Sequence, residues 1–113
     1  MSPAGRHVLV DAEVACLPPP AALVALCEAA IEASGMHVEC LVRKDFRPQG
    51  MTAVWVLSES HFAVHTYPEH NYLSIDCYTC GDGGNPHAAV EHLLAALSPV
   101  VRYSAQAVAR GAL

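Results

Sequence analysis

Residues 51–80 read MTAVWVLSESHFAVHTYPEHNYLSIDCYTC and carry the strongest structural signal in the chain. Apolar and β-branched residues fill 51–57, 60–66 and 72–79, and only short polar runs separate these segments. Segments of this kind, bounded by turn residues, predict three neighbouring antiparallel strands. The last two strands would be joined by a loop at 67–71.

The rest of the chain alternates between the period of a strand and that of a helix. Alternation of apolar residues predicts further strands at 6–14, 36–42 and 100–108. Helical spacing follows the three prolines at 18–20 and follows Asn85-Pro86, an N-cap and a first helical residue. This order predicts an α+β two-layer sandwich, in which an antiparallel sheet carries two helices on one face. We expect a second copy of the chain to cover the other face, which predicts a homodimer.

Composition limits the classes of function. A length of 113 residues suits a single domain, 1–113. The net charge is −5 with only 6 Lys and Arg residues, which argues against nucleic-acid binding. No apolar run approaches the roughly 20 residues that span a membrane, and the first residues lack a signal-peptide core, so we expect a cytoplasmic protein. An odd count of 5 cysteines indicates reduced thiols.

Local pairing makes a specific prediction about the hairpin of 60–66 and 72–79. If its loop is centred near residue 70, facing positions sum to about 140. Ser60 would then face Cys80, and His65 would face Ile75. His65 is five positions from Ser60, so the two point to opposite faces unless the strand bends or bulges.

The Cys-x-x-Cys pair formed by Cys77 and Cys80 raises the question of a metal site. A structural zinc needs four ligands, usually from two such motifs, and a second motif is absent from the sequence. Positions i and i+3 of a strand also face opposite ways. We therefore expect no metal, and we expect Cys16, Cys27, Cys40 and Cys77 to be small core residues.

Three motifs around these strands closely resemble those of prokaryotic-type S-adenosylmethionine decarboxylase proenzymes, which are pyruvoyl-dependent. They are Ser-Glu-Ser-His at 58–61, His-Thr-aromatic-Pro-Glu at 65–69 and Asp-x-x-Thr-Cys-Gly at 76–81. Further similarities at 5–7, Pro86, Ala89 and 110–111 extend the resemblance over nearly the whole chain.

The resemblance implies that the chain cuts itself between Glu59 and Ser60. Ser60 would attack the carbonyl of Glu59, and elimination from the resulting ester would leave a β chain, 1–59, and an α chain, 60–113. Residue 60 would become a pyruvoyl group that forms a Schiff base with the substrate amine and accepts electrons when carbon dioxide leaves. The implied product, decarboxylated S-adenosylmethionine, serves polyamine (spermidine) biosynthesis.

The resemblance also assigns roles to four further residues near the cleavage point. His65 would take part in proton removal during processing, and Thr52 and His61 would support it. Cys80 would return a proton to the substrate carbon after decarboxylation, as a neutral thiol can near pH 7.

The implied substrate pocket departs in part from the family pattern. Phe46 and Tyr67 would stack on adenine, and Glu69 would bind ribose hydroxyls. Tyr67 stands where tryptophan is common, Arg47 stands where an apolar residue is usual, and Thr52 replaces a usual serine while keeping a hydroxyl.

These departures leave L-ornithine and L-arginine as alternative substrates, since Glu69, Asp76 or Asp82 could bind their distal cation. A non-catalytic partner subunit is the remaining alternative. Such a degenerate copy should have lost Ser60, His65 or Cys80, and the chain retains all three.

Overall fold

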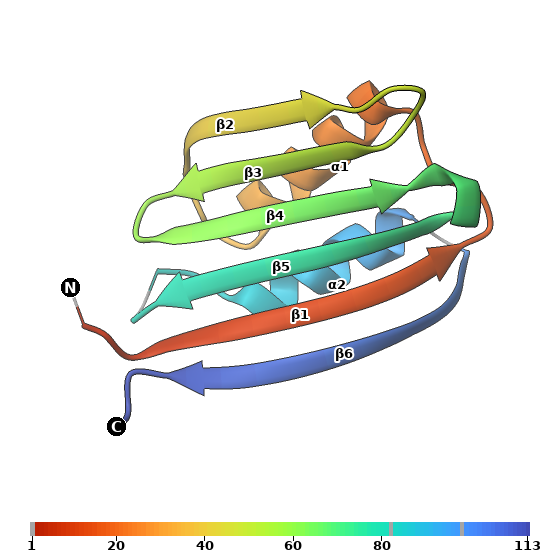
Figure 1. Ribbon diagram of the computed structural model, residues 1–113. Helices are drawn as coiled ribbons and strands as arrows, with labels where there is room; N and C mark the ends of the chain where they lie inside the picture. The colour runs from red at the N-terminus through yellow and green to blue at the C-terminus, as the bar shows by residue number, and fades with distance from the viewer. Residues whose placement is uncertain (1, 82, 98) are drawn as a thin grey trace.

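The computed structural model describes residues 2–81, 83–97 and 99–113 (Figure 1). Six strands form one antiparallel sheet in the order β2-β3-β4-β5-β1-β6. The strands are β1 (Gly5–Val14), β2 (Val38–Asp45), β3 (Met51–Leu57), β4 (Ser60–Tyr67), β5 (Tyr72–Cys80) and β6 (Val100–Arg110). Helices α1 (Pro20–Ala33) and α2 (Pro86–Ala96) lie side by side on one face of this sheet (Figure 1). The predicted α+β sandwich is therefore confirmed.

Local sequence features explain where both helices begin and where α1 ends. The prolines at 18–20 start α1, since proline is tolerated in a first turn, and Gly35 follows its end with a φ of 83°. Asn85 caps α2, because its side chain accepts hydrogen bonds from the backbone N–H groups of His87 (3.0 Å) and Ala88 (3.2 Å).

The core lies between the helices and the sheet. Trp55 of β3 is fully buried, meets Phe62 of β4 edge to face at 5.8 Å, and donates its indole N–H to Glu28 of α1 at 3.0 Å. Burying each of these rings contributes about 1.5–3 kcal/mol, and truncating either to alanine costs about 3–5 kcal/mol. The contact therefore fixes α1 against β3 and β4.

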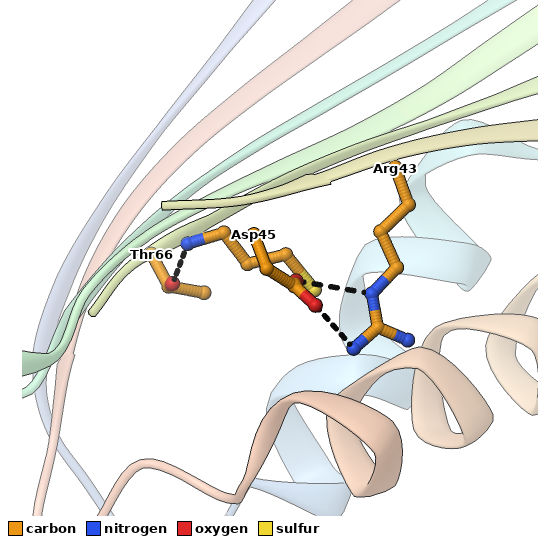
Figure 2. Close-up of polar contacts among 4 residues, drawn as sticks. Arg43, Asp45 and Thr66 are labelled. Carbon is orange, nitrogen blue, oxygen red and sulfur yellow. Dashed lines mark hydrogen bonds and ion pairs between the residues drawn. The ribbon is translucent and has the colours of Figure 1, made fainter. Parts of the chain in front are cut away.

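Strand β2 differs from its predicted bounds of 36–42, because it starts two residues later and continues to Asp45. The extension is polar: Arg43 donates two hydrogen bonds to Asp45, at 3.1 and 3.0 Å (Figure 2). An edge strand tolerates charged residues because one of its sides is not paired with another strand. The charged residues after position 42 are therefore not the end of β2. Nearby, the backbone N–H of Met51 donates to Thr66 Oγ1 at 2.9 Å, which ties the start of β3 to β4 (Figure 2).

The predicted register of the β4–β5 hairpin is wrong by one position. Ser60 pairs with Thr79 instead of Cys80, and His65 pairs with Ser74 instead of Ile75. The loop contains a short 3-10 helix, Pro68–His70, closed by Asn71 at a φ of 49°, and Tyr67 pairs with Tyr72 across it. The centre of the loop thus lies half a residue before residue 70, which accounts for the shift of one position in the pairing.

The face of the sheet turned away from the helices is called the open face below. Alternation places His7, His61, His65, Asp76 and Cys80 on it. The same face exposes apolar side chains at Val42 (65% exposed), Val56 (44%) and Val108 (37%). Within the described residues, neither helix is long and apolar enough to cross a membrane.

Candidate active site

The predicted cleavage point lies in the tight turn between β3 and β4. Leu57 pairs with Ser60, so Ser58 and Glu59 alone form the turn. Glu59 has a φ of 64°, a left-handed conformation that costs a residue with a side chain about 1–2 kcal/mol. Ser58 secures the turn by donating to Glu39 Oε1 of β2 at 2.7 Å. The Glu59–Ser60 bond therefore follows a strained residue in a fixed turn.

Ser60 itself lies on the helix side of the sheet, where its hydroxyl is buried. Ser60 Oγ and the hydroxyl of its ladder partner Thr79 have no hydrogen-bond partner among the described residues. Gly83 lies beside them, since a Cβ built there would stand 3.4 Å from Ser60 Oγ. Buried polar atoms are nearly always paired, so two unpaired hydroxyls facing each other mark a functional site. A free hydroxyl next to a strained peptide suits conversion of Ser60 to a pyruvoyl group.

Cys80 lies on the opposite, open face of the same end of the sheet. Its Sγ is 3.4 Å from the hydroxyl of Tyr78, and this contact is the main cause that raises the pKa of Tyr78. The ring of His61 stacks on Tyr78 at 5.6 Å. Burial, followed by the charge of nearby His7, lowers the pKa of His61. Ser60, Thr79, Cys80 and Tyr78 are called the scissile end below.

A second group of predicted residues surrounds a cavity of about 330 Å³ at the other end of β3 and β4, called the Phe46 cavity. His65 Nδ1 lies 3.1 Å from Thr52 Oγ1, its partner across the ladder. Gln49 donates to Glu69 Oε2 at 2.9 Å and so orients that carboxylate. The lining includes Phe46, Gln49, Thr52, His65, Tyr67 and Glu69.

The structure thus brings the predicted residues together in two groups. Five of them share the Phe46 cavity, whereas Ser60 and Cys80 lie at the scissile end. His65 is about 17 Å from Ser60 along β4 at the usual rise per residue. The ladders of β4 run without a register shift, so the bend that could have joined the two is absent from this strand.

Larger cavities contain fewer of the predicted site residues. One of about 540 Å³ is lined by Glu13, Tyr67, His70, Tyr72, Ser74 and Arg102. It shares Tyr67 with the Phe46 cavity but includes neither Ser60, His65 nor Cys80. The smaller cavity is therefore the better candidate for substrate.

Several residues were missed or misjudged from the sequence. Gln49 and Tyr78 gave no signal, and Thr79 was only one position of the motif at 76–81, because their importance depends on neighbours from other segments. Cys77 is buried, with a pKa raised to about 12 by burial, and faces away from Cys80, so the pair cannot chelate one ion. Cys16 and Cys40 are exposed, so their prediction as core residues is wrong. Asp82 lies outside the described residues.

Comparison with known proteins agrees with the motifs. The model of a family described as S-adenosylmethionine decarboxylase matches residues 6–111. The chain is 39% identical over 98 residues to an S-adenosylmethionine decarboxylase proenzyme 2 from Bacillus cereus, covering 84% of this chain and 80% of that protein. It is 40% identical over 113 residues to an S-adenosylmethionine decarboxylase proenzyme from Symbiobacterium thermophilum, covering 96% and 86%.

The fold is similar to a solved structure as well. The crystal structure of the adenosylmethionine decarboxylase from Aquifex aeolicus superposes with a TM-score of 0.87 at 28% sequence identity. The match covers 100% of this chain and 95% of that one.

Proposed function

Because the chain belongs to the S-adenosylmethionine decarboxylase family, we propose that it is a self-processing, pyruvoyl-dependent decarboxylase of S-adenosylmethionine. The observation that carries the proposal is the buried hydroxyl of Ser60, which has no hydrogen-bond partner among residues 2–81, 83–97 and 99–113 and directly follows Glu59 at a φ of 64°. The product, decarboxylated S-adenosylmethionine, suits polyamine biosynthesis, as the family implies.

Self-cleavage would take place at the turn between β3 and β4. Ser60 Oγ attacks the carbonyl carbon of Glu59, the C–N bond breaks as a C–O bond forms, and the hydroxyl proton moves to nitrogen. Elimination then removes the Cα proton of residue 60, forms a Cα–Cβ double bond as the bond from Cβ to the ester oxygen breaks, and leaves Glu59 as a C-terminal carboxylate. Water replaces the nitrogen at residue 60 and ammonia departs. Release of the left-handed Glu59 favours this direction.

The pyruvoyl group then supplies an electron sink for decarboxylation, which protein side chains lack. The chain's own residues bind the substrate and move protons. Phe46 and Tyr67, 48% and 43% exposed, offer aromatic faces at the cavity, and Glu69 offers an oriented carboxylate to ribose hydroxyls. Arg47 is exposed and is not part of the cavity lining, so its charge does not oppose a sulfonium substrate. Cys80 would return the proton to carbon.

A homodimer would bring the open-face members of the two groups together. The scissile end and the Phe46 cavity lie at opposite ends of the sheet, and six residues of β5, about 20 Å, separate Cys80 from the partner position of His65. A two-fold axis that lies between two stacked open faces and runs across the strands brings Cys80 of one copy to the Phe46 cavity of the other, twice. The exposed Val42, Val56 and Val108 would be buried by this contact.

Self-cleavage is tested by the mass of the purified chain. We expect fragments of residues 1–59 and 60–113, the second with a blocked, carbonyl-bearing N-terminus, and we expect Ser60→Ala to stay whole. A wild-type chain that remains intact after long incubation would contradict the proposal.

Substrate choice is tested on the cleaved protein with carboxyl-labelled S-adenosylmethionine, L-ornithine and L-arginine. We expect kcat/KM for carbon dioxide release to be highest with S-adenosylmethionine. A preference for either free amino acid would overturn the substrate while leaving the processing step intact.

A further inference from the structure

Tyr78 occupies a position that neither the motif comparison nor the proposed mechanism uses. It lies two residues before Cys80 on β5, so both side chains point to the open face. Its hydroxyl lies 3.4 Å from Cys80 Sγ, within hydrogen-bond distance for sulfur.

Residues of three other strands contact the ring of Tyr78: its two neighbours, β4 and β1, and β6 beyond β1. His61 of β4 stacks on it at 5.6 Å, and His7 of β1 meets it edge to face at 5.7 Å. The guanidinium of Arg110 from β6 lies 5.8 Å from the ring centroid, a cation–π distance. These contacts leave the ring little freedom to move away from the thiol.

Gly5 of β1 completes this arrangement. It pairs with Cys80 across the ladder, and a Cβ built on Gly5 would stand 2.5 Å from the Tyr78 hydroxyl oxygen. Only glycine leaves room for the hydroxyl at this point. The hydroxyl therefore fills a fixed position between the backbone of β1 and the sulfur of Cys80.

We propose that Tyr78 is a positioning residue for the Cys80 thiol. The inference rests on the proposed role of Cys80 as proton donor. When the S–H bond breaks, the proton goes to the substrate carbon that has lost carbon dioxide, and the bonding pair stays on sulfur. The Tyr78 hydroxyl then donates to the thiolate until sulfur regains a proton from water.

A neutral phenol is needed for this donation. The raised pKa of Tyr78, caused first by its contact with Cys80, keeps the hydroxyl protonated over the working pH range. Other ionisable groups face the pair from every neighbouring strand: His7 from β1, His61 from β4, Asp76 from β5 and Arg110 from β6. Tyr78→Phe leaves these groups in place and removes the hydroxyl alone.

The first test reads the thiol directly and does not depend on catalysis. In the uncleaved Ser60→Ala chain, with the exposed Cys16 and Cys40 changed to serine, Cys80 is the accessible thiol because the other two cysteines are buried. We expect Tyr78→Phe to move the pH midpoint of iodoacetamide labelling of Cys80 upward by about one unit, since the thiolate loses a charge-assisted donor. Tyr103→Phe, on an exposed tyrosine of β6, is the matched control.

The second test uses the cleaved enzyme. We expect Tyr78→Phe to cleave normally, to bind substrate with unchanged KM, and to lose about tenfold in kcat. A labelling midpoint equal to that of the parent would overturn the positioning role, whether or not the enzyme decarboxylates. A shifted midpoint in a protein without decarboxylase activity would instead overturn the proposed function and leave the contact established.

Discussion

At the scale of single residues, Thr79 links processing to stability. The residue is 1% exposed and its hydroxyl has no hydrogen-bond partner among the described residues, so the folded state bears a desolvation cost without a compensating hydrogen bond. We expect Thr79→Val, measured by chemical denaturation in the uncleaved Ser60→Ala chain, to raise the free energy of unfolding by about 1 kcal/mol. In the wild-type background the same change should slow cleavage about tenfold, because the hydroxyl faces Ser60.

Thr66→Val is the matched control for stability. Its hydroxyl accepts a hydrogen bond from the Met51 backbone N–H, so the substitution strands a buried donor and should lower the unfolding free energy by about 1–3 kcal/mol. If both substitutions destabilise the chain alike, Thr79 has a partner in solution and its assignment to processing fails.

Residue identities within the motifs could be predicted, but their neighbours could not. Ser60, His65 and Cys80 stand out because hydroxyl, imidazole and thiol groups gather in a short segment. Thr79 reads as an ordinary strand threonine, and only the pairing with Ser60 gives it a role. Gln49 likewise gains its role from a contact with Glu69, twenty positions away.

At the scale of elements, alternation predicted each strand, whereas register depended on a detail of the loop. A 3-10 turn at Pro68–His70 shifts every pair of the β4–β5 ladder by one position. A shift of one position would pair inward-facing residues of one strand with outward-facing residues of the other. The observed ladder instead pairs the buried Phe62 with the buried Cys77. The faces of the two strands therefore predict the register better than the assumed centre of the loop does.

The contact of β1, β4 and β5 through His7, His61 and Tyr78 makes stability depend on pH. The pKa of His61 in the folded chain is lowered, first by burial and then by the charge of His7. Below the unfolded pKa of about 6.5 the unfolded chain therefore binds more protons than the folded one, so stability falls as pH falls. We expect the unfolding midpoint of the uncleaved chain to decrease from pH 7 to pH 5, and His61→Gln to reduce that decrease.

His92→Gln, on an exposed residue of α2, serves as the control and should leave the pH dependence as in the parent. An identical slope in His61→Gln and its parent would show that the strand cluster is not the source of acid sensitivity.

At the scale of the whole molecule, a single chain contains the predicted site residues but keeps them in two separate groups. Helices α1 and α2 cover one face of the sheet (Figure 1). The open face carries Cys80 and His65 at separate ends. A single sheet keeps its two ends apart, so in the proposed homodimer a second open face would supply the missing half of each site. The sequence predicted that one face of the sheet is left uncovered. The distance between Cys80 and His65 on that face became clear only from the pairing of β4 with β5.

A composite site predicts that two different defects can complement each other. Cys80→Ala disables the scissile end, and Glu69→Ala disables the Phe46 cavity, so each homodimer should release carbon dioxide at a small fraction of the wild-type rate. In a mixed dimer, one site combines both defects and the other combines the two intact halves. Random pairing of equal amounts therefore restores about one quarter of the wild-type activity.

The measurement is the rate of decarboxylation by co-expressed chains that carry different tags. After purification through both tags only mixed dimers remain, so the expected recovery rises to about one half of the wild-type activity. If every site lay within a single chain, mixing would give no more activity than the sum of the two separate variants, and the two-fold arrangement would be wrong.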